Sequence, residues 1–322
     1  MPKLSAILPV KTKGRHYADN IARCDILFSS LRHFGSPDMF SKFLIVVPHD
    51  EFGDAQNYAR AWSDFPVEVV DESVHFPAFA EFNQPHQIRP WHRQQIIKLN
   101  APALIDTEYF LVLDPDCFAT HPFTLDMLLP GGKALTHIEP RSVDPKIWLP
   151  SSELLKQDPQ LDHDGIWWTP AILSATICRH LHRRLEELYQ TDWQRVLLAN
   201  YVINWTEYTL YWLNAEREGL IDQFHAKAEP GQRNLHARES VWNVAKFEDW
   251  RADEHFAPEA DGLFAVVQSN TYIEPGRVVD KLRPHFPITL QPYERYESLT
   301  LKMREFYSAL ARRGLGLLRR RP

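Results

Sequence analysis

Short apolar runs recur along the first half of the chain, and each is followed by a segment with polar residues or helical spacing. Unbroken apolar runs of this length are typical of strands that are covered on both faces. They predict strands at residues 4–10, 42–49, 67–71, 109–114, 133–137 and 263–268. Apolar residues at helical spacing predict helices at 17–34, 51–64, 91–105, 169–190, 193–218 and 293–318. The helix at 169–190 is expected to begin with Thr169 as its N-cap and Pro170 at its first position.

Strands that alternate with helices form β-α-β units. The pattern therefore predicts an α/β fold with a mostly parallel, Rossmann-like central sheet flanked by helices. We expect residues 1–140 to form this α/β half, and 141–292 to form a helical and loop-rich half of the same domain. Residues 140–165 and 222–258 are polar and rich in Pro, His or charge, and are expected to be loops. A basic helix at 293–322 follows.

The charge distribution argues against a general nucleic-acid-binding protein. The 322 residues include 36 Lys and Arg and 42 Asp and Glu, a net charge of −6, whereas such proteins are usually basic. Residues 302–321 hold seven basic residues and one Glu, a net +6, which leaves −12 for the rest of the chain. The three cysteines form no C-x-x-C pair and no apolar run reaches about 18 residues, so neither disulfides nor a membrane-spanning helix is expected. We expect a cytoplasmic protein whose basic tail can meet an anionic membrane surface.

The most informative motif is the D-x-D of Asp114 and Asp116, which directly follows the apolar strand at 109–114. Ligands of parallel α/β sheets bind beyond the carboxyl ends of the strands, so both carboxylates are expected to face the ligand crevice. Paired carboxylates suit Mg²⁺ or Mn²⁺, which leave coordination positions for the phosphates of a substrate. A second D-x-D, Asp162 and Asp164, lies in a polar segment with no strand before it and is expected to be a chance occurrence.

Four further residues are candidates for a nucleotide site because of where they lie along the predicted elements. Lys11 follows the first strand and Asp71 ends the third, where a nucleotide could be bound; an exposed loop lysine and a turn cap are the alternatives. Arg93 and Lys98 lie in the helix at 91–105. They could bind a diphosphate or orient the carboxylates, or simply form a solvated helix face.

The second half contains candidates for the rest of a site. Glu207 lies among aromatic residues, and burial of this kind raises the pKa of a carboxyl group and suits a general base, although a surface glutamate fits the pattern too. Polar groups beside aromatic rings, as in a sugar pocket or any packed loop, occur at His163, Asp164, Trp167 and Trp168. The strand at 263–268 ends in Gln268, Ser269 and Asn270, and a third metal ligand could come from His255 or His285.

Five blocks taken together resemble a poorly characterised bacterial family grouped with the GT-A glycosyltransferases. They are LSAILPVKTK, the W-x-R-Q-Q-x-x-K-L helix, FLVLDPD, the W-T-P segment and T-E-Y-x-L-Y, spread over residues 4–270. The resemblance implies a GT-A fold and transfer of a sugar from a nucleoside diphosphate donor, with a UDP-sugar expected, to a glycan or lipid-linked acceptor. Together with the basic tail, this suggests a role in cell-envelope polysaccharide synthesis.

The resemblance also implies roles for the candidate residues. Asp116 would coordinate the metal that holds the donor diphosphate, and Asp114 would contact the ribose or the metal's water. Lys11 and Asp71 would lie beside the base and ribose. Inverting members place a carboxylate base at a helix start beyond the D-x-D, which suggests Glu207; the pattern over 193–218 shows no helix start there, so inversion and retention both stay open.

Two other interpretations fit parts of the sequence. Haloacid-dehalogenase-like phosphatases also use a D-x-D after an apolar strand, which would make Asp114 the nucleophile and Asp116 the acid. That family usually has Thr or Val where this chain has Phe118, and its motif lies near the N-terminus. A non-catalytic protein that binds a sugar nucleotide is the second alternative, and the two intact acids argue against it.

Overall fold

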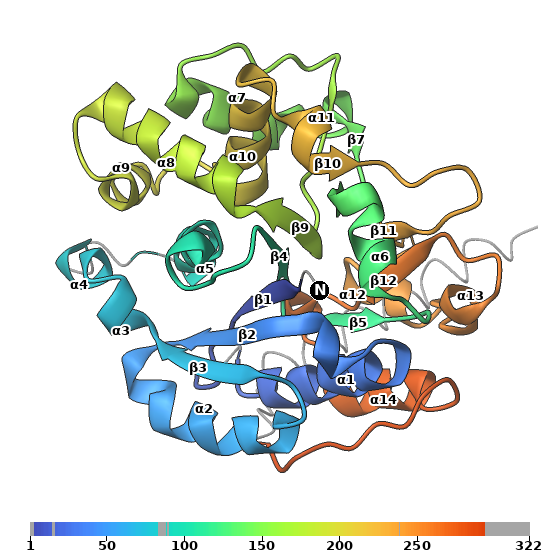
Figure 1. The fold of residues 1–322 in the computed structure, drawn as a ribbon. Coiled ribbons are helices and arrows are strands. Elements are labelled where there is room, and N and C mark those ends of the chain that lie inside the picture. The colour runs from blue at the N-terminus through green and yellow to red at the C-terminus, as the bar shows by residue number, and fades with distance from the viewer. Residues whose placement is uncertain (1–2, 15–16, 83–87, 89, 238, 294–322) are drawn as a thin grey trace, which may run out of the picture.

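The computed structural model describes residues 3–14, 17–82, 88, 90–237 and 239–293. Its centre is a five-stranded sheet in the order β3-β2-β1-β4-β9 (Figure 1). The strands of this sheet are β1 (Leu4–Pro9), β2 (Phe40–Val47), β3 (Val67–Asp71), β4 (Tyr109–Val112) and β9 (Ala171–Ser174). Strands β1 to β4 pair in parallel, and β9 runs antiparallel to β4. The predicted α/β fold with a mostly parallel, helix-flanked sheet is confirmed.

Both faces of the sheet are buried, which explains the continuous apolar runs. In β1, Leu4, Ala6 and Leu8 belong to one hydrophobic cluster, whereas Ile7 belongs to the cluster on the other face. One side is covered by α1 (Asn20–Phe34), α2 (Phe52–Ala59) and α14 (Pro275–Leu282) (Figure 1). The other is covered by α5 (Pro90–Leu99), α7 (Pro145–Leu155), α8 (Ala175–Tyr189), α9 (Trp193–Ala199) and α10 (Glu207–Arg217).

A second, three-stranded sheet continues from the end of β4. It has the order β11-β12-β5 and consists of β5 (Cys117–Ala119), β11 (Asn234–His236) and β12 (Gly262–Val266). Two short pairs complete the strands: β6 (Ala134–Leu135) with β10 (His225–Ala226), and β7 (Glu139–Pro140) with β8 (Asp164–Gly165). The remaining helices are α3 (Glu72–His75), α4 (Ala78–Phe82), α6 (Leu125–Leu128), α11 (Ile221–Phe224), α12 (Val244–Phe247) and α13 (Asp253–Phe256).

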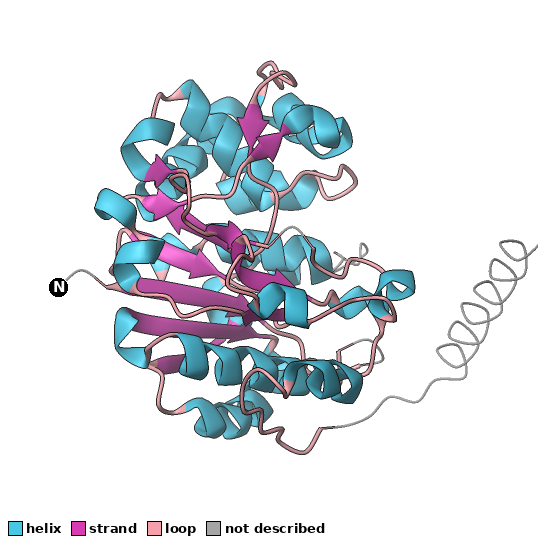
Figure 2. Cartoon of the chain, turned by 90° about the vertical axis from the view of Figure 1, so that its right-hand side faces the viewer, coloured by secondary structure: helices cyan, strands magenta, loops and turns pink. Residues whose placement is uncertain are grey.

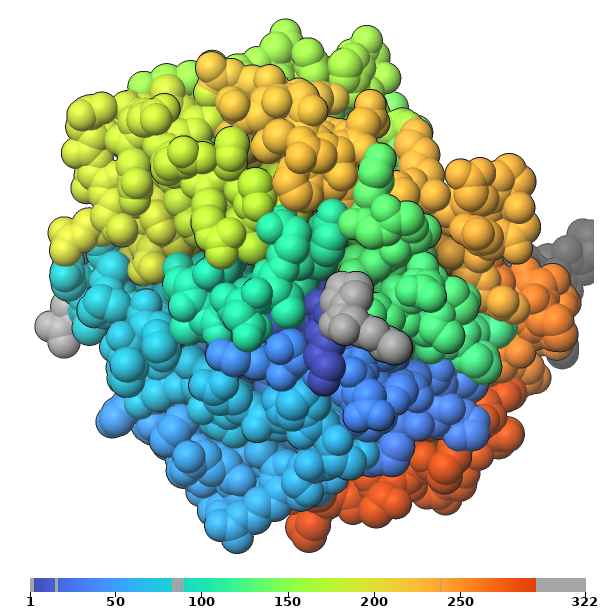
Figure 3. Space-filling view, viewed as in Figure 1, coloured from blue at the N-terminus to red at the C-terminus, as the bar shows by residue number. Residues whose placement is uncertain are grey.

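In Figure 2 the strands of the central sheet run across the view, and because β1 to β4 are parallel, their carboxyl ends share one edge. Figure 3 views the opposite edge, where the first third of the chain fills the lower left and centre, the segment of α14 the lower right, and the segments of α8 and α9 the upper left. The first third of the chain and the segments of α8 to α10 contribute to the same hydrophobic cluster, which contains both Ile7 and Trp205. Among the described residues, no helix is both long and apolar enough to cross a bilayer.

Several predicted elements differ from the structure. The helix expected at 169–190 is a strand, β9, followed by α8, and the N-cap of α8 is Ser174, whose hydroxyl accepts from the Ile177 N–H. The four residues of β9, three of them apolar, pair with β4 and so form a strand instead of a first helical turn. The segment expected to be a loop at 140–165 contains α7. The predicted helix at 293–318 and the basic tail at 302–321 lie outside the described residues.

Candidate functional site

A cleft of about 620 Å³ opens at the carboxyl edge of the central sheet. Its walls come from the residues after β1, β2 and β4, from α3, α4 and α5, and from the segment after β12. This is the edge at which open parallel sheets bind ligands, and the volume lies within the range of small-molecule and cofactor sites. Asp114 and Asp116 both line the cleft, as do Gln268, Ser269 and Asn270.

The D-x-D lies in the link between β4 and β5, so strands anchor it on both sides. Oδ2 of Asp116 accepts a hydrogen bond of 2.6 Å from the backbone N–H of Ser269. Burial raises the pKa of Asp116, and the neighbouring Asp114 adds to this effect, while the Ser269 N–H opposes it. Asp116 is therefore a partly desolvated carboxylate held beside a second acid, which is an arrangement that favours a bound cation.

Lys98 joins the cleft to a buried carboxylate behind it. Its Nζ lies 2.9 Å from Oδ1 of Asp114 and 3.0 Å from Oε1 of Glu207, and its side chain is only 2% exposed. Burial alone would lower the pKa of Lys98, but the two carboxylates outweigh it and hold the pKa well above its usual value. Lys98 therefore stays charged and fixes the orientation of Asp114, which is the second of the two roles considered for it.

Glu207 lies at the start of a helix, which the sequence pattern did not predict. The segment expected to be one helix at 193–218 contains two, α9 and α10, separated by residues 200–206. Thr206 caps α10 by accepting from the Thr209 N–H, and the Glu207 N–H donates to Oε1 of Gln95 at 2.9 Å. Burial raises the pKa of Glu207, although Lys98 opposes the effect.

The expected position of Glu207 at the cleft is not what the structure shows. Glu207 is 4% exposed, does not line the cleft, and bonds to Lys98 instead of pointing toward a bound substrate. A general base must lie within hydrogen-bond reach of the proton that it takes, directly or through one water. In this geometry the Glu207 carboxylate is paired with Lys98, which in turn contacts Asp114.

The other predicted nucleotide-site residues differ in their access to the cleft. Lys11 and Arg93 line it, whereas Asp71 does not. Asp71 bonds to Nδ1 of His49 at 2.6 Å and caps α3 by accepting from the Ser73 N–H. It therefore acts as a cap, which was the alternative to a nucleotide-binding residue. Arg93 lies 3.1 Å from Oε1 of Glu72 and stacks over the ring of Phe79 at 4.9 Å.

Three residues that the sequence did not single out organise the cleft. Glu72 fixes Arg93, and Glu51 is a buried carboxylate that accepts from the backbone and hydroxyl of Thr12 in the loop after β1. Arg23, on α1, donates to the backbone oxygens of Val267 at 3.3 Å and Ile273 at 2.7 Å. Arg23 thereby holds the segment whose Ser269 N–H binds Asp116. Charged residues in apolar contexts were the only sequence signal for these roles.

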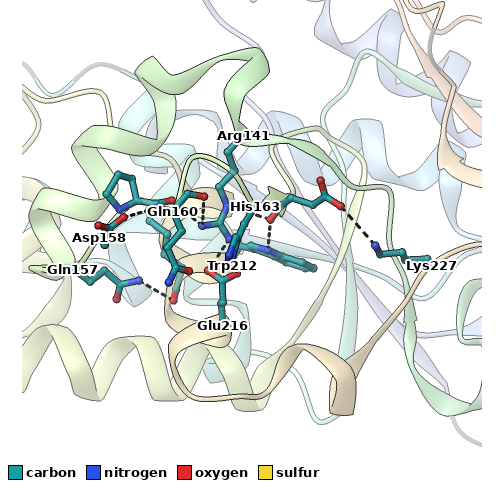
Figure 4. Close-up of polar contacts among 11 residues, drawn as sticks. Arg141, Gln157, Asp158, Gln160, His163, Trp212, Glu216 and Lys227 are labelled. Carbon is teal, nitrogen blue, oxygen red and sulfur yellow. Dashed lines mark hydrogen bonds and ion pairs between the residues drawn. The ribbon is translucent and has the colours of Figure 1, made fainter.

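The second D-x-D is part of a structural network away from the cleft (Figure 4). The guanidinium of Arg141, which is fully buried, donates to the backbone oxygens of Pro159 and Asp164 and to Oε2 of Glu216. His163 also bonds to Glu216, and the carboxylate of Asp164 lies 3.6 Å from Lys227. The network ties residues 156–165 to α10.

Neither histidine considered as a third metal ligand approaches the acids of the cleft. His255 accepts from the indole N–H of Trp250 at 2.9 Å, and His285 stacks on Phe256 with 4.0 Å between ring centroids. Within the described ranges, no group of three His, Cys, Asp or Glu side chains is arranged to hold a metal ion.

Solved structures similar to this chain are glycosyltransferases by their titles. Mouse xyloside xylosyltransferase 1 has a TM-score of 0.49 at 11% identity, with 85% of this chain and 100% of that chain covered. Core-mannan synthase A of Aspergillus fumigatus, in a form with Mn and GDP, has a TM-score of 0.43 at 9% identity, covering 66% and 70%. The galactosyltransferase LgtC, with donor and acceptor sugar analogues, has a TM-score of 0.42 at 12% identity, covering 90% and 98%. All three TM-scores lie below 0.5.

No curated protein matches the chain. Residues 1–290, which include every described element, match the profile of DUF6492, a family of unknown function. The chain therefore belongs to the DUF6492 family.

Proposed function

We propose that this protein is a GT-A-type glycosyltransferase that binds a nucleoside diphosphate sugar in the cleft. The observation that carries the proposal is the placement of Asp114 and Asp116 at the carboxyl edge of a parallel sheet, in a cleft of about 620 Å³ that Lys11 and Arg93 also line. Two acids and two basic side chains around one cavity suit a ligand that combines a divalent cation with phosphates.

The acids fit a hard divalent ion, Mn²⁺ or Mg²⁺. One oxygen of Asp114 is engaged by Lys98 and one of Asp116 by Ser269, so each carboxylate has a second oxygen for a ligand. Two carboxylates leave positions for water and for the donor phosphates, as magnesium sites in proteins commonly do. When bound, the ion would offset the negative charge that develops on the diphosphate leaving group.

The chain's own residues would position the donor. Arg93 is fixed by Glu72 and Phe79 and can present its guanidinium to the diphosphate, and Lys11 lies on the wall formed by the loop after β1. Such pre-positioned donors stabilise charge in the transition state without the cost of reorganisation. Lys98 and Glu207 would keep Asp114 oriented between turnovers.

The proposal extends to a UDP-sugar as donor and a glycan or lipid-linked acceptor of the cell envelope. The support for a membrane-proximal acceptor is the net charge of +6 over residues 302–321, since clusters of basic residues are attracted to anionic lipid headgroups. A phosphatase is less well supported, because Phe118 is buried in the core where that family has Thr or Val, and Asp114 is ion-paired with Lys98.

Titration calorimetry of UDP and GDP, with and without Mn²⁺, tests the proposal. We expect nucleotide binding that depends on the metal and is lost in Asp116→Asn. Asp164→Asn changes the other D-x-D and is the matched control, expected to bind like the wild type. Binding that does not need the metal, or that survives Asp116→Asn, contradicts the proposed site.

Activity requires a second measurement. Incubation with a panel of UDP- and GDP-sugars should release the nucleoside diphosphate slowly even without an acceptor, because water can replace the acceptor hydroxyl. Metal-dependent binding with no release from any donor favours a non-catalytic sugar-nucleotide-binding protein. Release of inorganic phosphate from p-nitrophenyl phosphate favours the phosphatase.

A further inference from the structure

A cluster of three aromatic rings lies outside the lining of the cleft and takes no part in the donor site described above. The ring centroids of Trp168 and Trp242 are 4.5 Å apart, and His236 stacks on both, at 5.8 Å from Trp168 and 5.7 Å from Trp242. The two tryptophans are partly exposed, whereas His236 is 3% exposed. Trp168 lies just before β9, whereas His236 is the last residue of β11 and Trp242 follows that strand.

One carboxylate orients this cluster. Oε2 of Glu139 accepts hydrogen bonds of 3.0 Å from the indole N–H groups of both Trp167 and Trp168, and Oε1 lies 3.3 Å from Nε2 of His137. Burial raises the pKa of Glu139, but these bonds outweigh it and leave the pKa below its usual value. Glu139 is therefore an ionised acceptor at the edge of a fixed aromatic surface.

Two chains of contacts connect the cluster to the acids of the cleft. Val241, the residue before Trp242, accepts from the Gln268 N–H at 3.0 Å, and the adjacent Val267 N–H donates to the backbone oxygen of Asp116. Neighbouring strands are about 4.8 Å apart, so two such steps place the backbone of Val241 roughly 10 Å from that of Asp116, and Trp242 is the next residue.

The second connection runs through the other tryptophan. Thr169, which follows Trp168, bonds through its hydroxyl to the hydroxyl of Tyr208 at 2.7 Å. The Tyr208 ring lies 5.6 Å from Nζ of Lys98, the lysine that holds Asp114.

A polar group within the cluster has no partner. Nε2 of His236 is buried and makes no hydrogen bond to any described residue. Because this nitrogen is buried, a ligand at the surface does not contact it, and His236 contributes to the cluster by stacking on the two tryptophans. The cavity behind Trp168 measures only about 10 Å³, enough for about one water, so a ligand has to lie across the exposed rings.

We propose that Trp168 and Trp242, backed by His236 and with Glu139 at the edge of Trp168, form the acceptor subsite and bind a neutral pyranose through its apolar face. This inference rests on the proposed function, since a saccharide here would bring a hydroxyl toward the donor held at Asp116. A pyranose matches the site because it combines one apolar face for the rings with hydroxyls for the partly exposed Glu139 carboxylate, the pairing of aromatic surface and few polar groups that ligand sites use.

Saturation-transfer NMR with the methyl glycosides of glucose, galactose, mannose and N-acetylglucosamine tests the subsite without any donor. At least one glycoside should bind the wild type. Trp242→Ala should weaken it about tenfold, and Trp242→Phe much less, because phenylalanine keeps an aromatic face. Calorimetry with UDP and Mn²⁺ on the same variants should give the wild-type affinity, which shows that the fold and the donor site are intact.

Asp116→Asn separates the two proposals, since it should lose UDP binding and keep glycoside binding. If no glycoside binds while UDP and Mn²⁺ do, the acceptor subsite is wrong and the donor site stands. If glycosides bind with this dependence on Trp242 and no nucleotide binds, the proposed glycosyltransferase is wrong and a saccharide site remains. Glycoside binding that Trp242→Ala leaves unchanged also contradicts the subsite.

Discussion

Nζ of Lys98 lies 3.0 Å from Oε1 of Glu207, and both side chains are almost fully buried although 109 positions separate them. The same nitrogen lies 2.9 Å from Asp114. One positive charge is thus shared between a carboxylate that faces the cleft and one that does not. A substitution of Glu207 is therefore expected to change the interaction between Lys98 and Asp114.

Glu207→Gln should weaken Mn²⁺-dependent UDP binding and slow turnover together. Without the second carboxylate, Lys98 pairs with Asp114 alone and competes more strongly with the metal for it. Calorimetry and a donor-hydrolysis assay on the same preparation would measure both effects.

Glu187→Gln, an exposed position on α8, is the control for this substitution and should leave both quantities unchanged. If Glu207→Gln abolishes transfer while UDP affinity stays the same, Glu207 is the general base that the family resemblance implied, and the positioning role assigned here is wrong.

Lys98→Met should destabilise the protein by about 3–5 kcal/mol, the usual effect of removing one partner from a buried ion pair. It leaves Glu207, which is 4% exposed, without its cation. Urea unfolding followed by circular dichroism gives the free energy of unfolding. Lys246→Met, at an exposed position, should stay within about 0.5 kcal/mol of the wild type.

Thr206→Ala should cost about 1 kcal/mol of stability, because it removes the N-cap of α10. The hydroxyl of Thr206 accepts from the Thr209 N–H at 3.1 Å, and Glu207 is the next residue. Thr206→Ser keeps the accepting oxygen and should recover most of the loss in thermal or urea unfolding. Equal losses for the two variants would show that the methyl group, and not the cap, is what matters.

Acid should destabilise the fold well above the pH at which carboxylates titrate. Burial lowers the pKa of His182, His225 and His236 to about 3, whereas their pKa in the unfolded chain is near 6.5. The unfolded state therefore binds more protons below pH 6.5, so stability falls as the pH drops from there toward 3. Between pH 7 and 5.5 each histidine should cost about 1.2 kcal/mol, and the three about 4 kcal/mol.

Urea unfolding at pH 7 and 5.5 would measure this loss. His225→Gln should lose about 1.2 kcal/mol less than the wild type between the two values, whatever its stability at pH 7, because one of the three titrating groups is gone. A loss identical to that of the wild type would show that His225 does not titrate on unfolding as described.

The parallel strands could be predicted from the sequence because a strand that is buried on both faces has an unbroken run of apolar residues, as in β1, β2 and β4. The sequence placed the D-x-D at the cleft for the same reason. The error at 169–190 arose because Thr-Pro is a strong helix-start signal, whereas pairing with β4, a long-range contact, decides that Ala171–Ser174 is a strand. The missed start of α10 has a local cause: residues 200–206 contain no Gly or Pro to mark the break.

Contacts between distant segments could not be predicted at all. Nothing near Lys98 in the chain indicates that it binds Glu207, and nothing near Asp116 indicates the Ser269 N–H. The ion pair of Arg93 with Glu72 and the aromatic contacts of Trp242 also depend on how the loops fold together.

The bond between Asp116 and the Ser269 N–H spans 153 positions of the chain. The first 140 residues therefore cannot serve as a transplantable module, because a fragment that stops before residue 269 lacks one wall of its own cavity. A chimaera of two family members would need the segments around Asp116 and Ser269 from the same parent. A premature stop codon before residue 269 would remove this wall of the cleft although the codons for Asp114 and Asp116 are intact.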